Sequence, residues 1–229
     1  MSADEKIRVV IIGAGGFGKE VLWALLESNK NSKKYDIMGF LDDDKNKHDK
    51  VISGKKVLGS TEWALKNKIK NIKYVIAIGN GKTRKKIVNR LRKKDDEFLT
   101  VIHPSTIVSD SAIIGNGTVV QAGTIITVDV KIGNHCRIDT NCTIAHDSRI
   151  SDFVDLSPGV HINGTNKIQT GAFVGSAAIT KENISIGKWS VIGAGTVLLA
   201  DVLDLSLYVG VPGKLKRKLS MPDENEVSI

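Results

Sequence analysis

The hydrophobic pattern of the chain changes its period near residue 102. Before that point, short apolar runs rich in β-branched residues alternate with segments whose apolar side chains recur every three or four positions. These patterns predict buried parallel strands and amphipathic helices, respectively. Beyond that point the helical period disappears, and an aliphatic side chain returns at every sixth position. We therefore expect two regions of different architecture.

The first region predicts an α/β domain. The run KIRVVIIG predicts a buried strand, and the glycine-rich segment GAGGFG follows it. The next segment, KEVLWALLES, presents one apolar helical face made of Val21, Leu22, Leu25 and Leu26. Further strands are expected at YDIMGFLD and KYVIAIG, and a further helix at TRKKIVNRLRKK. Alternating strands and helices favour a parallel sheet of the Rossmann-like type.

The second region carries the strongest regularity in the sequence. Counting from Ile102 in steps of six, sixteen of seventeen positions are aliphatic, and the exception is Thr180. The residue two positions earlier is usually small, and glycine often follows the aliphatic residue. This six-residue period predicts a parallel β-helix, in which the aliphatic side chains fill the interior. Cys136 and Cys142 fall at small inward positions, so we expect both to be reduced and buried.

Composition and charge narrow the classes of function. The chain shows no run of about eighteen apolar residues and no cleavable signal, so we expect a cytoplasmic protein without a membrane span. The net charge of +8 does not indicate nucleic-acid binding, because the lysines are scattered and no aromatic residues alternate with them. Positive charge also suits nucleotides and coenzyme A. Two cysteines at this spacing predict neither a metal site nor a disulfide framework.

The glycine-rich segment predicts a phosphate-binding turn. Gly13, Gly15 and Gly18 fit the pattern G-x-G-x-x-G, which lets the backbone approach a phosphate at a helix N-terminus. Asp42 and Asp43 follow the second expected strand, where a dinucleotide-binding fold places an acid for a ribose hydroxyl. An NAD enzyme and a purely structural glycine turn are the alternatives. The short first region forms only half of a full dinucleotide fold, which disfavours NAD.

The segment NCTIAHDSRI places His146 next to Asp147 within the repeat. His146 comes two positions after the inward Ile144, so its side chain should point out of the β-helix. If three hexads close one turn, successive coils lie about 4.8 Å apart, and Gly164 lies beside His146 on the next coil. A neighbouring carboxylate can orient an outward imidazole and make it more basic. A plain surface histidine is the alternative.

Several motifs, taken in order, resemble a known family. They are VVIIGAGGFGKEV, GFLDDD, VIAIGNGKTRKKI, VIHPST, the AHD around His146, YVGVPGK and the hexad array. With them the chain resembles the left-handed β-helix acyltransferases, in particular the bacterial nucleotide-sugar N-acetyltransferases and related sialic acid O-acetyltransferases. The resemblance implies a Rossmann-like nucleotide-sugar-binding domain over residues 1–101 and a left-handed β-helix acetyltransferase domain over 102–213. A basic, then acidic, C-terminal tail is expected over 214–229.

The resemblance implies an acetyl-CoA-dependent reaction in a homotrimer, with active sites between subunits. His146 matches the general base that takes a proton from the sugar amine, and Asp147 matches the acid that orients the imidazole. The backbone N–H of Gly164 matches the donor to the thioester carbonyl oxygen, whose developing charge needs a fixed dipole. The expected coenzyme A contacts are Gly164, Gly175, Ser176, Ala177, Gly193 and Ala194.

The resemblance also implies that the N-terminal domain holds the nucleotide diphosphate. The expected contacts are Gly13, Gly15, Gly16, Phe17, Asp42, Asp43, Gly79, Asn80 and Gly81. Asp139 is expected either near the sugar or exposed at a strand edge. Some relatives carry histidine at the positions of Phe17 and Asp155, which leaves the exact sugar open. His135 and His161 are expected at the surface or at an interface.

We therefore predict N-acetylation of a nucleotide-linked amino-deoxy sugar, of the 4-amino-4,6-dideoxy type, for a glycan such as O-antigen. O-acetylation of a sugar hydroxyl is the second interpretation. A non-catalytic trimer that binds sugar nucleotides is the third. The sequence leaves the base of the nucleotide open among uridine, thymidine and guanosine.

Overall fold

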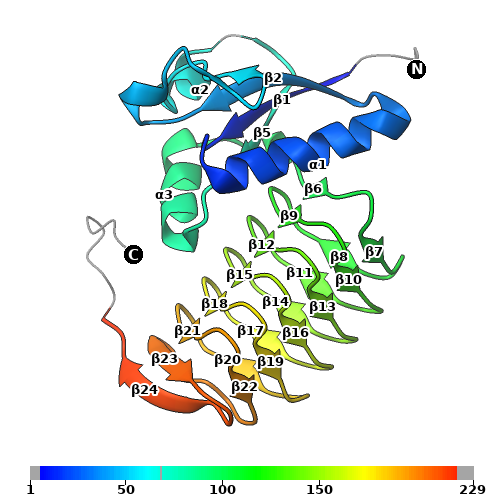
Figure 1. Ribbon diagram of the computed structural model, residues 1–229, viewed down its shortest axis with the longest axis vertical. Helices are drawn as coiled ribbons and strands as arrows, with labels where there is room; N and C mark the ends of the chain where they lie inside the picture. Colours follow the sequence, from blue (N-terminus) through cyan, green and yellow to red (C-terminus); the bar gives the residue numbers. More distant parts are fainter. Residues whose placement is uncertain (1–5, 68, 221–229) are drawn as a thin grey trace.

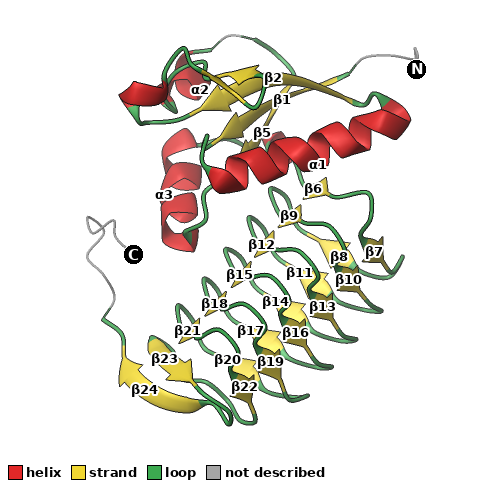
Figure 2. Cartoon of the chain, viewed as in Figure 1, coloured by secondary structure: helices red, strands yellow, loops and turns green. Residues whose placement is uncertain are grey.

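The computed structural model describes residues 6–67 and 69–220. An α/β domain stands at one end of a long β-helix, whose coils step away from it toward the C-terminus (Figure 1). Within the described residues the helices belong to the first domain, and short strands build the rest (Figure 2). The fold is thus a parallel α/β domain followed by a solenoid of the left-handed β-helix type, as the sequence predicts.

The first domain is built on three parallel strands in the order β2-β1-β5. These strands are β1 (Ile7–Ile12), β2 (Tyr35–Leu41) and β5 (Ile72–Ile76). The helices are α1 (Gly16–Ser32), α2 (Glu62–Lys66) and α3 (Gly81–Leu91), with short 3-10 turns η1 (Lys45–Lys47) and η2 (Asp95–Glu97). A small antiparallel hairpin joins β3 (Val51–Ile52) to β4 (Lys55–Lys56).

The two faces of this sheet pack against different helices. Val9 and Ile11 of β1 belong to the core that contains α1, whereas Val10 and Ile12 belong to the core that contains α2 and α3. Leu26 was expected on the apolar face of α1, but it is 43% exposed because it lies at the margin of that face. The helix after β1 covers one face of the sheet, and the helix after β5 covers the other. The carboxyl ends of these two strands therefore form a topological switch point, where open α/β sheets bind ligands.

The β-helix is a three-sided prism, and each side is a parallel sheet. The domain face consists of β6 (Val101–Ile102), β9 (Val119–Val120), β12 (Arg137–Ile138), β15 (Asp155–Leu156), β18 (Phe173–Val174) and β21 (Val191–Ile192). The apolar face consists of β7 (Ile107–Val108), β10 (Ile125–Ile126), β13 (Thr143–Ile144), β16 (His161–Ile162), β19 (Ile179–Thr180) and β22 (Val197–Leu198). The basic face consists of β8 (Ile113–Ile114), β11 (Lys131–Ile132), β14 (Arg149–Ile150), β17 (Lys167–Ile168) and β20 (Ser185–Ile186).

We name the edges of the prism after one residue on each. The Asp139 edge joins the domain face to the apolar face, and the His146 edge joins the apolar face to the basic face. The His135 edge joins the basic face back to the domain face. The register between coils is the expected 18 residues, because Thr143 pairs with Ile125 on one side and with His161 on the other.

The aliphatic positions of the repeat fill the interior of the β-helix. All of them from Val120 to Leu198 are buried, together with the hydroxyl-bearing exception Thr180, which accepts a hydrogen bond from the side chain of Asn166. Ile102 was expected inside but is 37% exposed, since the first coil has a neighbour on one side only. Both cysteines are free and buried, as predicted. Burial raises the pKa of the Cys136 thiol to about 12 and that of Cys142 to about 11.

The C-terminal end of the prism is closed by a hairpin. Strand β23 (Ser206–Val209) continues the domain face and pairs in antiparallel fashion with β24 (Lys214–Lys218). The basic part of the expected tail is therefore a strand, because its backbone groups pair with β23. Its side chains are exposed. The acidic part, over residues 221–229, lies outside the described residues. None of the described helices is long and apolar enough to cross a bilayer.

Candidate active site

His146 lies on the His146 edge with its imidazole directed outward. Its side chain is 59% exposed, and Nδ1 lies 2.9 Å from Oδ2 of Asp147, which is 56% exposed. The backbone of this edge is fixed from both neighbouring coils, since Asp147 donates to Val128 and Thr165 donates to His146. Asp147 itself adopts a left-handed φ of 60°, which turns its carboxylate back toward the imidazole. The Nε2 atom has no hydrogen-bond partner among the described residues, so it is available to a proton.

Gly164 lies directly beside this imidazole on the next coil, as the 18-residue register predicts. A Cβ atom added to Gly164 would lie 2.7 Å from both Cε1 and Nε2 of His146. Any side chain there would displace the ring, so glycine is what lets the imidazole occupy this position. The N–H of Gly164 has no acceptor within the described part of the chain. A free donor therefore lies next to a free imidazole nitrogen.

The glycine loop after β1 leaves the N-terminus of α1 uncovered. Gly13 has a φ of +107°, and Gly18 packs so closely on the Gly13 carbonyl that a Cβ would lie 2.0 Å from its oxygen. These two glycines are structural. Gly15 and Gly16 face open space, and Gly15, the residue before the first helical turn, provides no side-chain cap. The free N–H groups of α1 are thus accessible.

Asp42 and Asp43 already have partners within the chain. Asp42 accepts from the N–H of Ala14 at 2.9 Å and pairs with Lys47 at 3.0 Å. Burial alone would raise the pKa of Asp42, but these contacts hold the pKa of the carboxyl below its ordinary value. Asp43 contacts the Thr61 N–H at 2.8 Å and ion-pairs with Arg90, and its pKa is lowered against the same effect of burial. These carboxylates hold the loops around Ala14 and Thr61 in place. Their contact with a nucleotide stays a prediction.

The second glycine-containing turn, after β5, docks onto the β-helix. Asn80 caps α3 by accepting from Thr83 at 3.0 Å. The carboxylate of Asp155, on the domain face, lies close to Gly81, whose backbone N–H acts to lower the pKa of that carboxyl. A Cβ on Gly81 would lie 2.6 Å from the Phe153 carbonyl oxygen, so the close contact between the two regions needs glycine here. The N-terminus of α3 is therefore occupied by the protein's own acid.

A buried ionic cluster, which we call the joint, fixes the first domain to the β-helix. It consists of Arg84 from α3 and of Arg137 and Asp155 from the domain face. Arg84 pairs with Asp155 at 2.8 Å, with side chains 2% and 4% exposed, and Arg137 Nε lies 3.3 Å from the same carboxylate oxygen. Burial raises the pKa of Asp155, and the two guanidinium groups act in the opposite direction. Asp155 thus pairs with two arginines of the chain itself.

The sequence analysis did not identify Arg84 and Arg137. Arg84 occupies the buried stripe of α3 together with Ile87 and Leu91, and this position is the one sequence signal that could have found it. His135 was expected at the surface or at an interface, and it is buried at the joint, stacked on Phe153 with ring centroids 5.4 Å apart. Burial lowers the pKa of His135 to about 4, so the ring is neutral near pH 7.

The expected coenzyme A contacts fall mainly on the Asp139 edge. Gly175 and Gly193 are packed against the next segment of the β-helix along the chain. Ser176, Ala177 and Ala194 are exposed. Asp139 lies on the same edge and is only 7% exposed, so the interpretation as a solvated strand-edge acid is wrong. His161 lies on the apolar face, with Nδ1 2.8 Å from the hydroxyl oxygen of Thr143.

The expected site residues lie on opposite sides of the prism. The glycine loops meet the domain face, since Phe17 covers the guanidinium of Arg137 at 5.5 Å and Gly79 lies against the same group. The His146 edge joins the two other faces and is therefore the edge opposite the domain face. Within one chain, the body of the β-helix separates His146 from the glycine loops.

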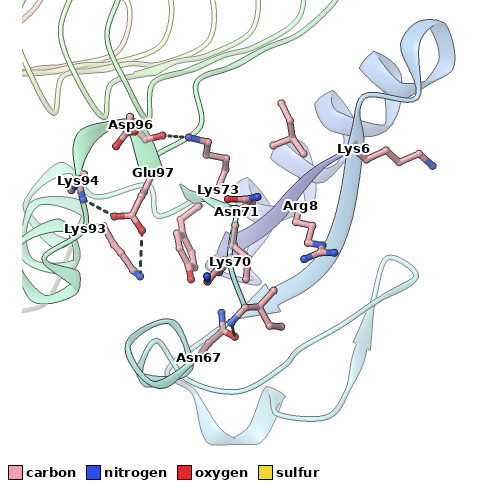
Figure 3. Close-up of a pocket in the computed structure, with 14 residues that line it drawn as sticks. Lys6, Arg8, Asn67, Lys70, Asn71, Lys73, Lys93, Lys94, Asp96 and Glu97 are labelled. Carbon is pink, nitrogen blue, oxygen red and sulfur yellow. Dashed lines mark hydrogen bonds and ion pairs between the residues drawn. The ribbon is translucent and has the colours of Figure 1, made fainter. Parts of the chain in front are cut away.

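A basic cavity of about 610 Å³ lies elsewhere, at the amino ends of β1 and β5. Figure 3 shows its lining, which includes Lys6, Arg8, Lys70, Lys73, Lys93 and Lys94. The glycine loops follow the carboxyl ends of the same strands, at the other edge of the sheet. The cavity contains none of the expected site residues. Among the described residues, no group of His, Cys, Asp and Glu side chains could hold a metal ion.

Comparison with known proteins gives consistent similarities over both regions. Residues 8–91 match the family described as the PglD N-terminal domain. The GDP-perosamine N-acetyltransferase of Escherichia coli O157:H7 is 31% identical over 190 residues, covering 81% of this chain and 82% of that protein. The UDP-N-acetylbacillosamine N-acetyltransferase of Bacillus subtilis is 38% identical over 109 residues, or 44% of each chain.

Solved structures with the same fold carry bound ligands. PerB from Caulobacter crescentus, in complex with CoA and GDP-perosamine, superposes with a TM-score of 0.82 at 30% identity, covering 91% of this chain and 97% of that one. The acetyltransferase domain of PglB from Neisseria gonorrhoeae, in complex with acetyl coenzyme A, gives a TM-score of 0.82 at 27% identity. It covers 92% of this chain and 100% of that one.

Proposed function

The chain belongs to the nucleotide-sugar N-acetyltransferases of the hexapeptide-repeat superfamily, and from this premise we propose the chemistry of its site. It is an acetyl-CoA-dependent enzyme whose acceptor is the amine of a nucleotide-linked sugar. The single observation that carries the proposal is the free Nε2 of His146 beside the free N–H of Gly164. A base and a neighbouring oxyanion donor are what acyl transfer to an amine requires.

In the proposed reaction the sugar amine attacks the carbonyl carbon of the acetyl thioester. Nε2 of His146 takes the proton that the nitrogen loses as the C–N bond forms. The N–H of Gly164 donates to the carbonyl oxygen while that oxygen carries negative charge. The C–S bond then breaks, and the proton on His146 goes to the thiolate of coenzyme A. Asp147 holds the proton-bearing Nδ1, which leaves Nε2 as the acceptor nitrogen.

We propose that the enzyme works as a homotrimer. The outward positions of the apolar face include Ile107, Ile125 and Ile179, which are 64%, 38% and 38% exposed. The matching positions of the basic face include Lys131, Arg149 and Lys167. An aligned apolar surface favours burial against a second copy of the chain, whereas the basic face favours water. The His146 edge borders the apolar face, so this assembly places His146 at the subunit boundary.

The trimer also explains how separated residues can form one site. The glycine loops of one subunit hold the nucleotide, and the sugar extends past the Asp139 edge to the His146 edge of a neighbouring subunit. Ser176, Ala177 and Ala194 line the path of coenzyme A along the Asp139 edge in this arrangement. The acceptor is proposed to be a 4-amino-4,6-dideoxy sugar on guanosine, uridine or thymidine diphosphate. The domain boundaries after residues 101 and 213 and a cytoplasmic location also stay predictions.

The experiment follows coenzyme A release with a thiol reagent. Purified protein and acetyl-CoA are mixed with amino-sugar nucleotides carrying GDP, UDP or dTDP, and in parallel with the same nucleotides bearing a hydroxyl at the amine position. We expect release with an amine-bearing acceptor only. Release with hydroxyl acceptors alone would favour sugar O-acetylation. Binding of sugar nucleotides without any release would favour a non-catalytic module.

A further inference from the structure

Arg137 projects from the β-helix into the switch point of the first domain. Its guanidinium lies 5.5 Å from the centre of the ring of Phe17, in the first turn of α1, which follows β1. A Cβ on Gly79, in the loop after β5, would lie 3.3 Å from Nη1 of Arg137. The group therefore stands between the carboxyl ends of β1 and β5, where α/β sheets bind their ligands.

The two arginines of the joint differ in what they contact. Arg84 is saturated: its nitrogens donate to the carbonyls of His135, Ile78, Gly79 and Phe153 and contact the Asp155 carboxylate. Arg137 contacts Asp155 through Nε alone, at 3.3 Å. The buried Nε makes no hydrogen bond, and no hydrogen bond joins Nη1 or Nη2 of Arg137 to any described residue. Its side chain is nevertheless only 16% exposed.

The charge of Arg137 is not balanced by the joint. Asp155 supplies one negative charge, and Arg84 already engages it at 2.8 Å. The nearby acids Glu20 and Asp139 form no ion pair with Arg137 within the described part of the chain. A mostly buried cation without hydrogen-bond acceptors is costly unless an anion binds to it.

The surroundings of Arg137 favour an anion that can accept two parallel hydrogen bonds from its guanidinium. The guanidinium carbon of Arg137 lies over the Phe17 ring, 5.5 Å from its centre, and guanidinium donors lie in the plane of the group as a fork. Such a fork matches the oxygens of a phosphate in a two-bond arrangement. Gly15 and Gly16, next to Phe17 at the start of α1, face open space, and the first turn of the helix offers further N–H donors.

We propose that Arg137 binds the diphosphate of the nucleotide sugar. The β-helix thereby contributes a binding residue to the site of the first domain, and Arg84 and Asp155 position it. This inference rests on the proposed function, because the diphosphate is part of that substrate. It also gives Phe17 a role in orienting the guanidinium.

The test compares the binding of GDP, UDP and dTDP with that of guanosine, uridine and thymidine by calorimetry. Arg137→Gln should weaken binding of the preferred diphosphate about tenfold to a hundredfold, while binding of the matching nucleoside stays unchanged. Arg137→Lys should retain part of the affinity, because it keeps the charge but loses the fork. Lys131→Gln is the matched control, since it removes one charge at the same hexad position on the basic face.

The outcomes separate this inference from the proposed function. If wild-type protein binds none of the diphosphates, the nucleotide-sugar site itself is wrong. If wild-type protein binds one and Arg137→Gln binds it equally well, only the role of Arg137 is overturned. Equal weakening of diphosphate and nucleoside would also overturn it, because that pattern indicates a structural role in the joint. Unfolding midpoints of all variants establish that each one is folded.

Discussion

The His146 edge and the joint each bring an acid to a basic side chain, in opposite surroundings. His146 and Asp147 are 59% and 56% exposed, and one imidazole nitrogen has no partner among the described residues. Arg84 and Asp155 are 2% and 4% exposed, and every nitrogen of Arg84 is engaged. An exposed pair contributes little to stability but can exchange protons with a ligand. A buried pair is costly to break and is suited to holding two domains together.

The largest expected effect concerns the exposed pair. His146→Ala should lower the rate of coenzyme A release about a hundredfold or more, because it removes the proposed general base. The unfolding midpoint should not change, since the side chain makes no buried contact. Initial rates and a thermal melt of the same preparation measure both. A wild-type rate in this variant would exclude His146 from the reaction.

The buried pair should show the reverse behaviour. Arg84→Met should lower the free energy of unfolding by about 3–5 kcal/mol, because it leaves the buried Asp155 without its main partner. Urea titrations measure the loss. Arg90→Met is the matched control: it lies on the same helix and also pairs with an aspartate, but these side chains are 47% and 50% exposed. Its loss should stay below about 1 kcal/mol; similar losses in both variants would refute the distinction.

The joint should also make stability depend on pH through His135. Its pKa is about 4 in the folded protein and 6.5 as the reference value, so only the unfolded chain gains a proton between these values. The stabilisation that neutral His135 gives to the folded state is therefore complete above about pH 6.5, and it is lost as the pH falls toward 4. The loss approaches about 3 kcal/mol at most.

His135→Phe keeps the stacking with Phe153 and removes the titrating group. Urea unfolding at several pH values between 7 and 4 should show a smaller decline of stability for this variant than for the wild-type protein. Parallel declines in the two proteins would show that His135 is not the group responsible.

The smallest expected effect returns to the exposed pair. Asp147→Asn keeps a hydrogen-bond acceptor at Nδ1 but removes the negative charge beside the imidazolium that forms in the proposed reaction. We expect the rate of acetyl transfer to fall about tenfold, with no change in stability. Steady-state rates at saturating acetyl-CoA measure the change. A loss as large as that of His146→Ala would mean that Asp147 does more than orient the ring.

The sequence predicted the His146 edge because its geometry follows from a local period. Once the hexads place Ile144 inside, the register puts Gly164 beside His146 without further information. The joint could not be predicted in this way, since Arg84 and Asp155 come from different domains and meet only when both have folded. Asp139 illustrates the same limit. Its position on an edge follows from the repeat, but its burial depends on contacts that the period does not encode.

The central claim is that one subunit supplies the nucleotide site and another supplies His146. It can be tested with two variants that are each inactive for a different reason. His146→Ala lacks the base but keeps the glycine loops. Gly16→Glu keeps the base and places a carboxylate where the diphosphate should bind. Gly16 faces open space, and an acid in the first turn suits a helix N-terminus, so the fold should tolerate this change.

The decisive measurement is the acetyl-transfer rate of trimers co-assembled from equal amounts of the two variants. Random assembly should restore about a quarter of the wild-type activity, because that share of sites combines an intact glycine loop with an intact His146 from the neighbouring subunit. Mixed trimers as inactive as either variant alone would contradict the account, since the base and the nucleotide site would then belong to one subunit.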